Sequence, residues 1–228
     1  MQPARIATSI CAVAAIGWMC VGAVNSGAAE ETVFGVSQQL DVAASRPSES
    51  MDEALERFYE RARRAVELTP GNAAAHELLA ILDVRRAVVH GTHDYLGEAH
   101  AHFVDAIAAR PTSAYSWSNF ATERYAVGDT GQVFEVALRR AASLGPYEPE
   151  VQRDVAVYGL AVWEEVAPET RDAIDHMMTN GMRRDPAQML QIAQRRGRLD
   201  VACRHLPGVQ RQTDSKWVQL CQGMEATL

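Results

Sequence analysis

Apolar and small residues recur at fixed distances from four prolines, Pro70, Pro111, Pro146 and Pro186. A small residue lies five positions before each proline, and apolar or small residues lie eight and twelve positions before it. An apolar residue and an alanine follow the first three prolines at nine and ten positions: Leu79-Ala80, Phe120-Ala121 and Val155-Ala156. Small residues let paired helices approach each other, and proline ends a helix. The pattern therefore predicts a repeated helical hairpin.

The same pattern, with its capping residues, places the expected helices along the chain. We expect them at residues 51–68, 73–90, 95–109, 113–127, 131–144, 149–165, 169–184 and 187–196, with one or two short helices between 198 and 222. No segment carries the signals of a β-hairpin. The predicted fold class is all-α.

The first residues of the chain have a different pattern. Arg5 precedes the nineteen uncharged residues 6–24, and a membrane-spanning helix needs about 20 apolar residues. Residues 1–29 are therefore expected to be a single-pass membrane anchor. A cleaved signal segment is the alternative, because Ser26-Gly27-Ala28-Ala29 offers small residues to a signal peptidase.

Charges around this segment predict where the rest of the chain lies. Arg5 precedes it, and Glu30 and Glu31 follow it. The positive-inside rule then keeps the amino terminus in the cytoplasm and sends the remainder across the membrane. We expect an inner-membrane protein with its folded part in the periplasm, or a secreted or periplasmic protein after cleavage. Residues 30–50 have no sustained apolar period and are expected to be a flexible linker before a folded domain at 51–228.

The proline offsets resemble those of the tetratricopeptide repeat, most closely in the unit that ends at Pro146. That unit contains Trp117, Phe120, Ala121, Gly128, Ala141 and Pro146. The resemblance covers about Met51 to Arg196 and implies a degenerate solenoid of antiparallel hairpins, with Trp117 buried in the packing. The prolines are 41, 35 and 40 residues apart instead of 34, so we expect longer helices or turns near 90–97 and 166–169.

A narrower resemblance links the chain to the VpsP-type family of bacterial exopolysaccharide biosynthesis proteins. It is carried by residues 115–121, 137–152 and 197–200, together with the amino-terminal apolar helix and the carboxy-terminal cysteine pair. The family has no assigned catalytic residues. The resemblance therefore implies a pathway, exopolysaccharide synthesis or export, and not a reaction.

Charge and motifs narrow the function classes. The net charge of −7 argues against nucleic acid as the main partner, because phosphate binding needs a basic face. Neither a nucleophile elbow nor a phosphate-binding loop is present. We therefore predict no catalytic residues and no cofactor, and expect a non-catalytic scaffold or adaptor in an envelope assembly.

The repeat frame predicts where such a scaffold would bind its partner. First-helix positions facing an inner groove hold tyrosine, hydroxyl and charged side chains: Glu77, Tyr115, Ser118, Thr122, Tyr125, Glu150 and Arg153. This surface suits a segment of a protein partner in a polysaccharide synthesis or export complex. It also suits a sugar chain, since aromatic faces pack on sugar rings, so a glycan-binding module is an alternative. The alternative is that these residues form an ordinary solvated face of the helices and bind nothing.

Histidines and cysteines offer two further candidates. His90, His93, Asp94, His100 and His102 are close in sequence, and a small envelope metalloprotein or hydrolase using His90, His93 and His100 is a further alternative. Because His100 and His102 are two apart, they point to different sides of a helix, and we expect no metal. Cys203 and Cys221 lie eighteen residues apart and predict a disulfide in an oxidising compartment, with buried free thiols as the alternative.

Overall fold

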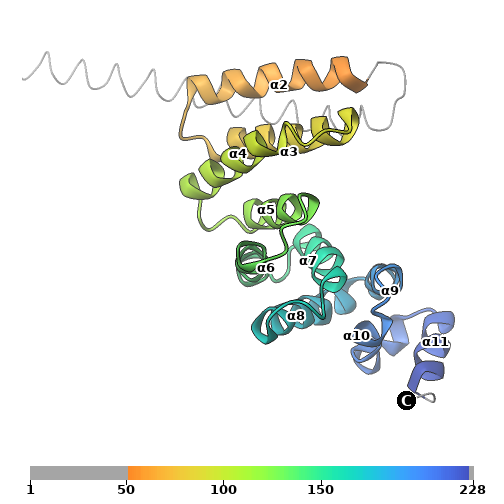
Figure 1. Cartoon of the computed structure of the whole chain (residues 1–228). Coiled ribbons are helices and arrows are strands. Elements are labelled where there is room, and N and C mark those ends of the chain that lie inside the picture. The colour runs from red at the N-terminus through yellow and green to blue at the C-terminus, as the bar shows by residue number, and fades with distance from the viewer. Residues whose placement is uncertain (1–50, 226–228) are drawn as a thin grey trace, which may run out of the picture. The chain divides into compact units, whose positions relative to one another are not determined.

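A computed structural model describes residues 51–225, and every regular element in that range is helical (Figure 1). The helices are α2 (Met51–Leu68), α3 (Ala73–His90), α4 (Leu96–Ala109), α5 (Ala114–Ala126), α6 (Gln132–Leu144), α7 (Pro149–Ala161), α8 (Pro168–Arg184), α9 (Pro186–Arg195), α10 (Leu199–Cys203) and α11 (Ser215–Glu225). Two short 3₁₀ turns, η1 (Leu206–Gly208) and η2 (Gln210–Gln212), lie between α10 and α11. The all-α prediction is confirmed for these residues.

Helix ends follow from local chemistry. Asn72, Ser113 and Asp185 each precede a helix, and their side chains accept a hydrogen bond from a backbone N–H of the first turn. The expected helix at 149–165 was too long, because α7 ends at Ala161 and residues 162–167 form a turn. Ala167 precedes Pro168 and is extended, as the steric demand of a following proline requires, so α8 starts afresh at Pro168.

The chain divides into two compact units, the first ending at Arg110 and the second beginning at Pro111. In unit 1, helix α3 packs against both α2 and α4. In unit 2, the hairpins α5–α6 and α7–α8 stack so that α7 packs on α5 and α8 on α6, and α9 extends the array by packing on α7 and α8. This is the tetratricopeptide-like arrangement of antiparallel hairpins.

The proline offsets identified the core. Every residue five, eight and twelve positions before the four prolines is buried, as are the pairs at nine and ten positions after the first three. The requirement for a small residue is steric at Gly181, where an added Cβ would lie 2.6 Å from the Sδ atom of Met189. Ala121 and Ala141 are fully buried, as the repeat frame predicted.

Unit 1 contains an ionisable cluster around Arg86, within which Asp83 is buried. The guanidinium carbon lies 4.3 Å from the ring centre of Tyr59 and 4.2 Å from that of Tyr95. Arg86 also pairs with Glu56 at 3.0 Å and with Asp83 at 3.2 Å. Asp83 is fully buried, and burial raises the pKa of its carboxyl group to about 7 despite the neighbouring Arg86. Arg86 therefore ties α2 to α3 through both aromatic and ionic contacts.

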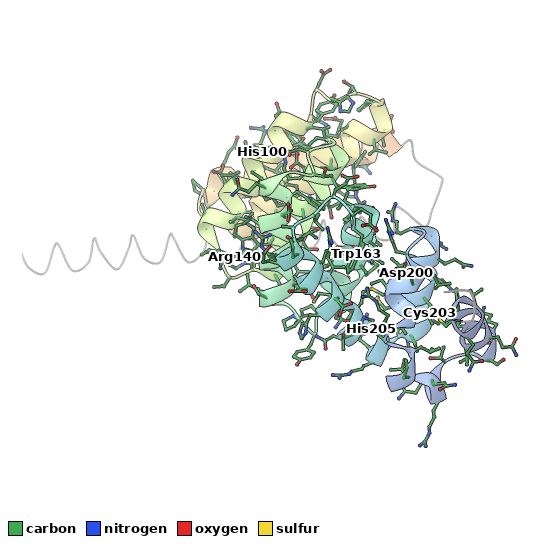
Figure 2. The ribbon with its side chains drawn as sticks, turned by 60° about the horizontal axis from the view of Figure 1, so that its bottom comes forward. His100, Arg140, Trp163, Asp200, Cys203 and His205 are labelled. Carbon is green, nitrogen blue, oxygen red and sulfur yellow. A yellow bond between two sulfur atoms is a disulfide. The ribbon has the colours of Figure 1, made fainter. Side chains whose placement is uncertain are left out.

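Unit 2 ends in a disulfide-linked cap. Cys203 at the end of α10 is bonded to Cys221 in α11, with their Cα atoms 5.4 Å apart. Figure 2 labels Cys203 and, close to it, His205. The His205 Nε2 atom lies 3.1 Å from a carboxylate oxygen of Asp175 on α8, which links the cap to the preceding hairpin.

None of the helices between residues 51 and 225 has the length and apolar character that crossing a bilayer demands. The expected anchor at 1–29 and the expected linker at 30–50 lie outside the described residues. Both stay predictions.

Candidate functional site

Four of the predicted groove residues lie on α5, and two lie on α7, the helix packed against it. Tyr115, Ser118, Thr122 and Tyr125 recur at helical spacing and share one side of α5. Glu150 and Arg153 are on α7. We call the surface formed by these six residues, with Glu148, Asp154 and Tyr158, the α5–α7 face. Glu77 belongs to unit 1, where it is half-buried on α3 and pairs with Arg110 at 3.6 Å.

Tyr115 is the exposed aromatic of this face, with 39% of its surface accessible. Its hydroxyl donates a 2.7 Å hydrogen bond to a carboxylate oxygen of Glu148, just before α7. That hydrogen bond, followed by burial and the charges of Glu148 and Glu150, raises the pKa of Tyr115 to about 12. The ring is therefore fixed in orientation, neutral at physiological pH and accessible to a partner.

The prediction that Ser118 lines an exposed groove was wrong, because Ser118 is buried. Its hydroxyl donates to the Oδ2 atom of Asp154 on α7 at 3.3 Å. Thr122 is half-buried and donates to the backbone carbonyl of Ser118 at 3.1 Å. The short hydroxyl side chains on this side of α5 serve helix packing. The sequence frame did not register how closely α7 approaches this side of α5.

Tyr125 is also more enclosed than predicted. It is half-buried, and its ring centre lies 5.1 Å from that of Tyr158 and 6.4 Å from that of Phe134. These distances suit tilted aromatic packing. Trp117, in contrast, was expected to be buried and is half-buried. Tyr125 therefore packs within the α5–α7 face, against Tyr158 and Phe134, and Tyr115 provides the accessible aromatic surface of this face.

Charged residues complete the face on α7. Glu150 and Arg153 are exposed, and Arg153 pairs with Asp154 at 3.0 Å. Burial raises the pKa of Asp154, and the contacts with Arg153 and the Ser118 hydroxyl partly offset this increase. The groove residues predicted from the sequence did not include Asp154 or Tyr158. Asp154 follows Glu150 by four residues, and Tyr158 follows Asp154 by four. This helical spacing could have indicated that both lie on the same side of α7 as Glu150.

A side-chain cap recurs six residues after three of the prolines. His76 Nε2 lies 2.9 Å from the carbonyl oxygen of Pro70, and Trp117 Nε1 donates to that of Pro111 at 2.9 Å. Gln152 Nε2 donates to the carbonyl oxygen of Pro146 at 2.8 Å. The first helix of each following hairpin thus anchors the turn that precedes it. This offset was present in the sequence but went unrecognised, because the three side chains share only an N–H group.

The histidines named as an alternative metal site, His90, His93 and His100, do not come together. His90 is exposed with its ring 5.6 Å from that of Tyr95, His93 and Asp94 are exposed, and His100 is half-buried on α4. His102 instead faces His76 across α3 and α4, with 3.3 Å between the two Nδ1 atoms. Among residues 51–225, His76, His102 and Asp105 form the one group of three ligand side chains close enough to share an ion.

No protein-family model and no curated protein matches the chain. Among solved structures it is similar to MamA protein, at 13% identity over 80% of this chain and 94% of that one, with a TM-score of 0.48. It is also similar to YrrB, described as a TPR protein with an unusual peptide-binding site, at 16% identity, 80% and 88% coverage and a TM-score of 0.46. A human IFIT1 dimer with PPP-AAAA matches at 12% identity, 70% and 44% coverage and a TM-score of 0.33.

Proposed function

We propose that this protein is a non-catalytic scaffold whose α5–α7 face binds a segment of a partner protein. The observation that carries the proposal is the accessible Tyr115 ring, held in place by Glu148 beside the exposed Glu150 and Arg153. An aromatic side chain that is already ordered loses little entropy on binding and contributes a large contact area. The surrounding charges then select which segment binds.

Charge complementarity points to a basic partner segment. Glu148, Glu150 and Asp154 contribute three carboxyl groups to the face, against the single guanidinium of Arg153. Arg153 is already paired with Asp154. A partner segment with a lysine or arginine side chain would therefore be attracted to Glu148 and Glu150, while its backbone or apolar groups contact Tyr115.

The cellular setting is part of the same proposal. The disulfide between Cys203 and Cys221 supports an oxidising compartment, since such bonds are rare in the cytosol. Together with the apolar segment at 6–24, this favours an envelope protein with residues 51–228 outside the cytoplasm. The resemblance of residues 115–121, 137–152 and 197–200 to VpsP-type proteins supports a role for this scaffold in exopolysaccharide synthesis or export.

A comparison of two charge reversals tests the binding face. Glu150→Lys changes the α5–α7 face, and Glu165→Lys makes the same change at an exposed residue of the turn between α7 and α8. We expect Glu150→Lys and Tyr115→Ala to reduce recovery of a partner from native membranes at least about tenfold, whereas Glu165→Lys leaves recovery unchanged. Equal recovery with all three variants would rule out the α5–α7 face as the binding surface.

The compartment is tested separately with two reporters fused after residue 50. A phosphatase that folds only outside the cytoplasm should be active, and a fluorescent protein that matures only in the cytoplasm should stay dark. The opposite result would reject the envelope setting and leave the binding face untouched.

A further inference from the structure

Unit 1 contains three potential metal ligands that the scaffold proposal does not use. The Nδ1 atoms of His76 and His102 are 3.3 Å apart, and His76 Nδ1 lies 3.7 Å from the Oδ2 atom of Asp105. The three ligand atoms all lie within 4.8 Å of one another. His76 is 7% exposed, His102 is half-buried and Asp105 is exposed. The cluster thus extends from the interior of unit 1 to its surface.

Local structure brings these residues together. His102 and Asp105 are three apart on α4 and therefore share one side of that helix. His76 lies in the first turn of α3, behind the Asn72 cap. Since α3 and α4 form a closely packed pair, the start of α3 supplies one ligand and α4 the other two.

The cap to Pro70 determines which nitrogen of His76 is available. A carbonyl oxygen only accepts hydrogen bonds, so the Nε2 atom of His76, 2.9 Å from the Pro70 oxygen, carries the proton. In the neutral ring, Nδ1 then has a free lone pair, and this is the atom that faces His102 and Asp105. Metal-bound histidines are commonly oriented by such a bond from the other ring nitrogen to a backbone carbonyl.

His102 is also suited to bind a metal. Burial, and then the neighbouring His76, hold the pKa of His102 below its ordinary value, against the opposing charges of Asp105 and Glu98. The lowered pKa favours the neutral imidazole, which is the form that coordinates metal ions.

We propose that His76, His102 and Asp105 bind a zinc ion, with the fourth coordination position open to water or to another molecule. Zinc bonds to imidazole nitrogen of about 2.0–2.1 Å place two ligands of a tetrahedron about 3.3–3.4 Å apart. The observed separation of 3.3 Å between the Nδ1 atoms agrees. Two imidazoles and one carboxylate form a typical three-ligand zinc set.

A direct hydrogen bond between the rings is the competing explanation of the same distance. His102 would then donate from Nδ1 to the Nδ1 lone pair of His76, and the pair would have no affinity for metal beyond that of surface histidines. Zinc binding at the two Nδ1 atoms excludes a proton between them. The two explanations therefore predict opposite results in a titration.

The test is calorimetric titration of the tag-free full chain with zinc chloride. We expect one zinc ion per chain. His102→Ala and Asp105→Asn should each weaken zinc binding by more than about tenfold. Removing a group that only hydrogen-bonds to a metal ligand already weakens metal binding by about tenfold or more, and these variants remove a ligand itself. His76→Gln is the matched variant for folding, because Gln152 makes the corresponding cap to Pro146 with its side-chain amide. This variant should keep its circular dichroism spectrum and lose zinc.

The His90→Ala, His93→Ala double variant is the control for adventitious histidine binding, and it should titrate like the wild type. Cobalt(II) should give the visible spectrum of a tetrahedral complex with the wild type but not with Asp105→Asn. The proposal is overturned if the wild type binds no zinc, if the three ligand variants bind zinc as tightly as the wild type, or if only the control variant loses binding.

Discussion

Helices α3 and α7 make the same cap with side chains of different chemistry. In α3, His76 binds the carbonyl of Pro70 and retains a second ring nitrogen that faces His102. In α7, Gln152 binds the carbonyl of Pro146, and its amide oxygen accepts a hydrogen bond from Arg184 at 2.9 Å. The repeat requires one N–H at this position and leaves the rest of the side chain free to vary. The residue at this position of the repeat can therefore serve as a metal ligand in unit 1, where it is His76. In unit 2 it is Gln152, which only makes hydrogen bonds.

The polar groups in the interiors of the two units also differ in chemistry. Unit 1 buries the carboxyl group of Asp83, whose Oδ2 atom has no hydrogen-bond partner among the described residues. Around the Gln152 cap, unit 2 places the amide of Asn180, which donates to the same Pro146 carbonyl at 3.1 Å. A buried acid makes stability depend on pH, and buried amides do not. Asp83 should therefore make the stability of unit 1 depend on pH, while the amides around the Gln152 cap make no such contribution. In unit 2, the raised pKa of Asp154 contributes in the same direction as Asp83.

The largest expected effect is the pH dependence that Asp83 gives to unit 1. Its pKa is raised from 3.8 to about 7, so between these values the native protein holds a proton that the unfolded chain has lost. The native state is therefore favoured at low pH, and this contribution declines as the pH rises from about 4 to about 7. Between pH 5 and pH 8 the loss should be about 2–3 kcal/mol. Urea unfolding of the wild type and Asp83→Asn at both pH values measures it, and parallel profiles would contradict it.

Removal of the disulfide should have an effect of comparable size, confined to unit 2. The bond closes a segment with a sequence separation of 18, and opening a loop of that size costs about 3 kcal/mol. The Cys203→Ser, Cys221→Ser double variant should exchange its α10 and α11 amides faster with deuterium. The α3 amides of unit 1 should not change. Faster exchange in α3 would show that the cap stabilises both units.

Packing along α5 should distinguish its buried side from its exposed end. Ala121→Leu and Ser118→Leu both force volume into tight helix contacts and should each cost about 1–3 kcal/mol. Ala126→Leu adds the same side chain at an exposed residue of that helix and should be nearly neutral. Thermal unfolding of the three variants would measure this. A neutral Ser118→Leu would restore the groove position that the sequence predicted.

The caps themselves should show the smallest effect. Trp117→Phe removes the N–H that binds the Pro111 carbonyl and should cost about 0.5–1.5 kcal/mol. His76→Gln retains an N–H for the Pro70 carbonyl, so stability without added metal should fall less. Urea unfolding midpoints of the two variants give the comparison. A larger loss for His76→Gln would show that His76 stabilises unit 1 by more than its cap.

The sequence predicted the helices well because small and apolar residues at fixed offsets from proline report directly on close helix packing. Ala121 and Ala141 are examples. It predicted side-chain exposure less well, because exposure depends on the neighbouring helix. Ser118 is buried by its contact with Asp154, and nothing in the α5 pattern reveals that contact. The pairing of His102 with His76 was not foreseen for a related reason, since the two histidines lie twenty-six residues apart in the sequence.

The most direct test of partner binding by the α5–α7 face is site-specific photo-crosslinking in native membranes. A photoreactive phenylalanine analogue would replace Tyr115, and in a second variant it would replace Arg140, which is exposed on α6 and labelled in Figure 2. We expect one protein partner to be crosslinked from position 115 and not from position 140. Glu150→Lys in the position-115 variant should abolish the crosslink. Crosslinking of the same partner from position 140 alone would contradict binding at the α5–α7 face.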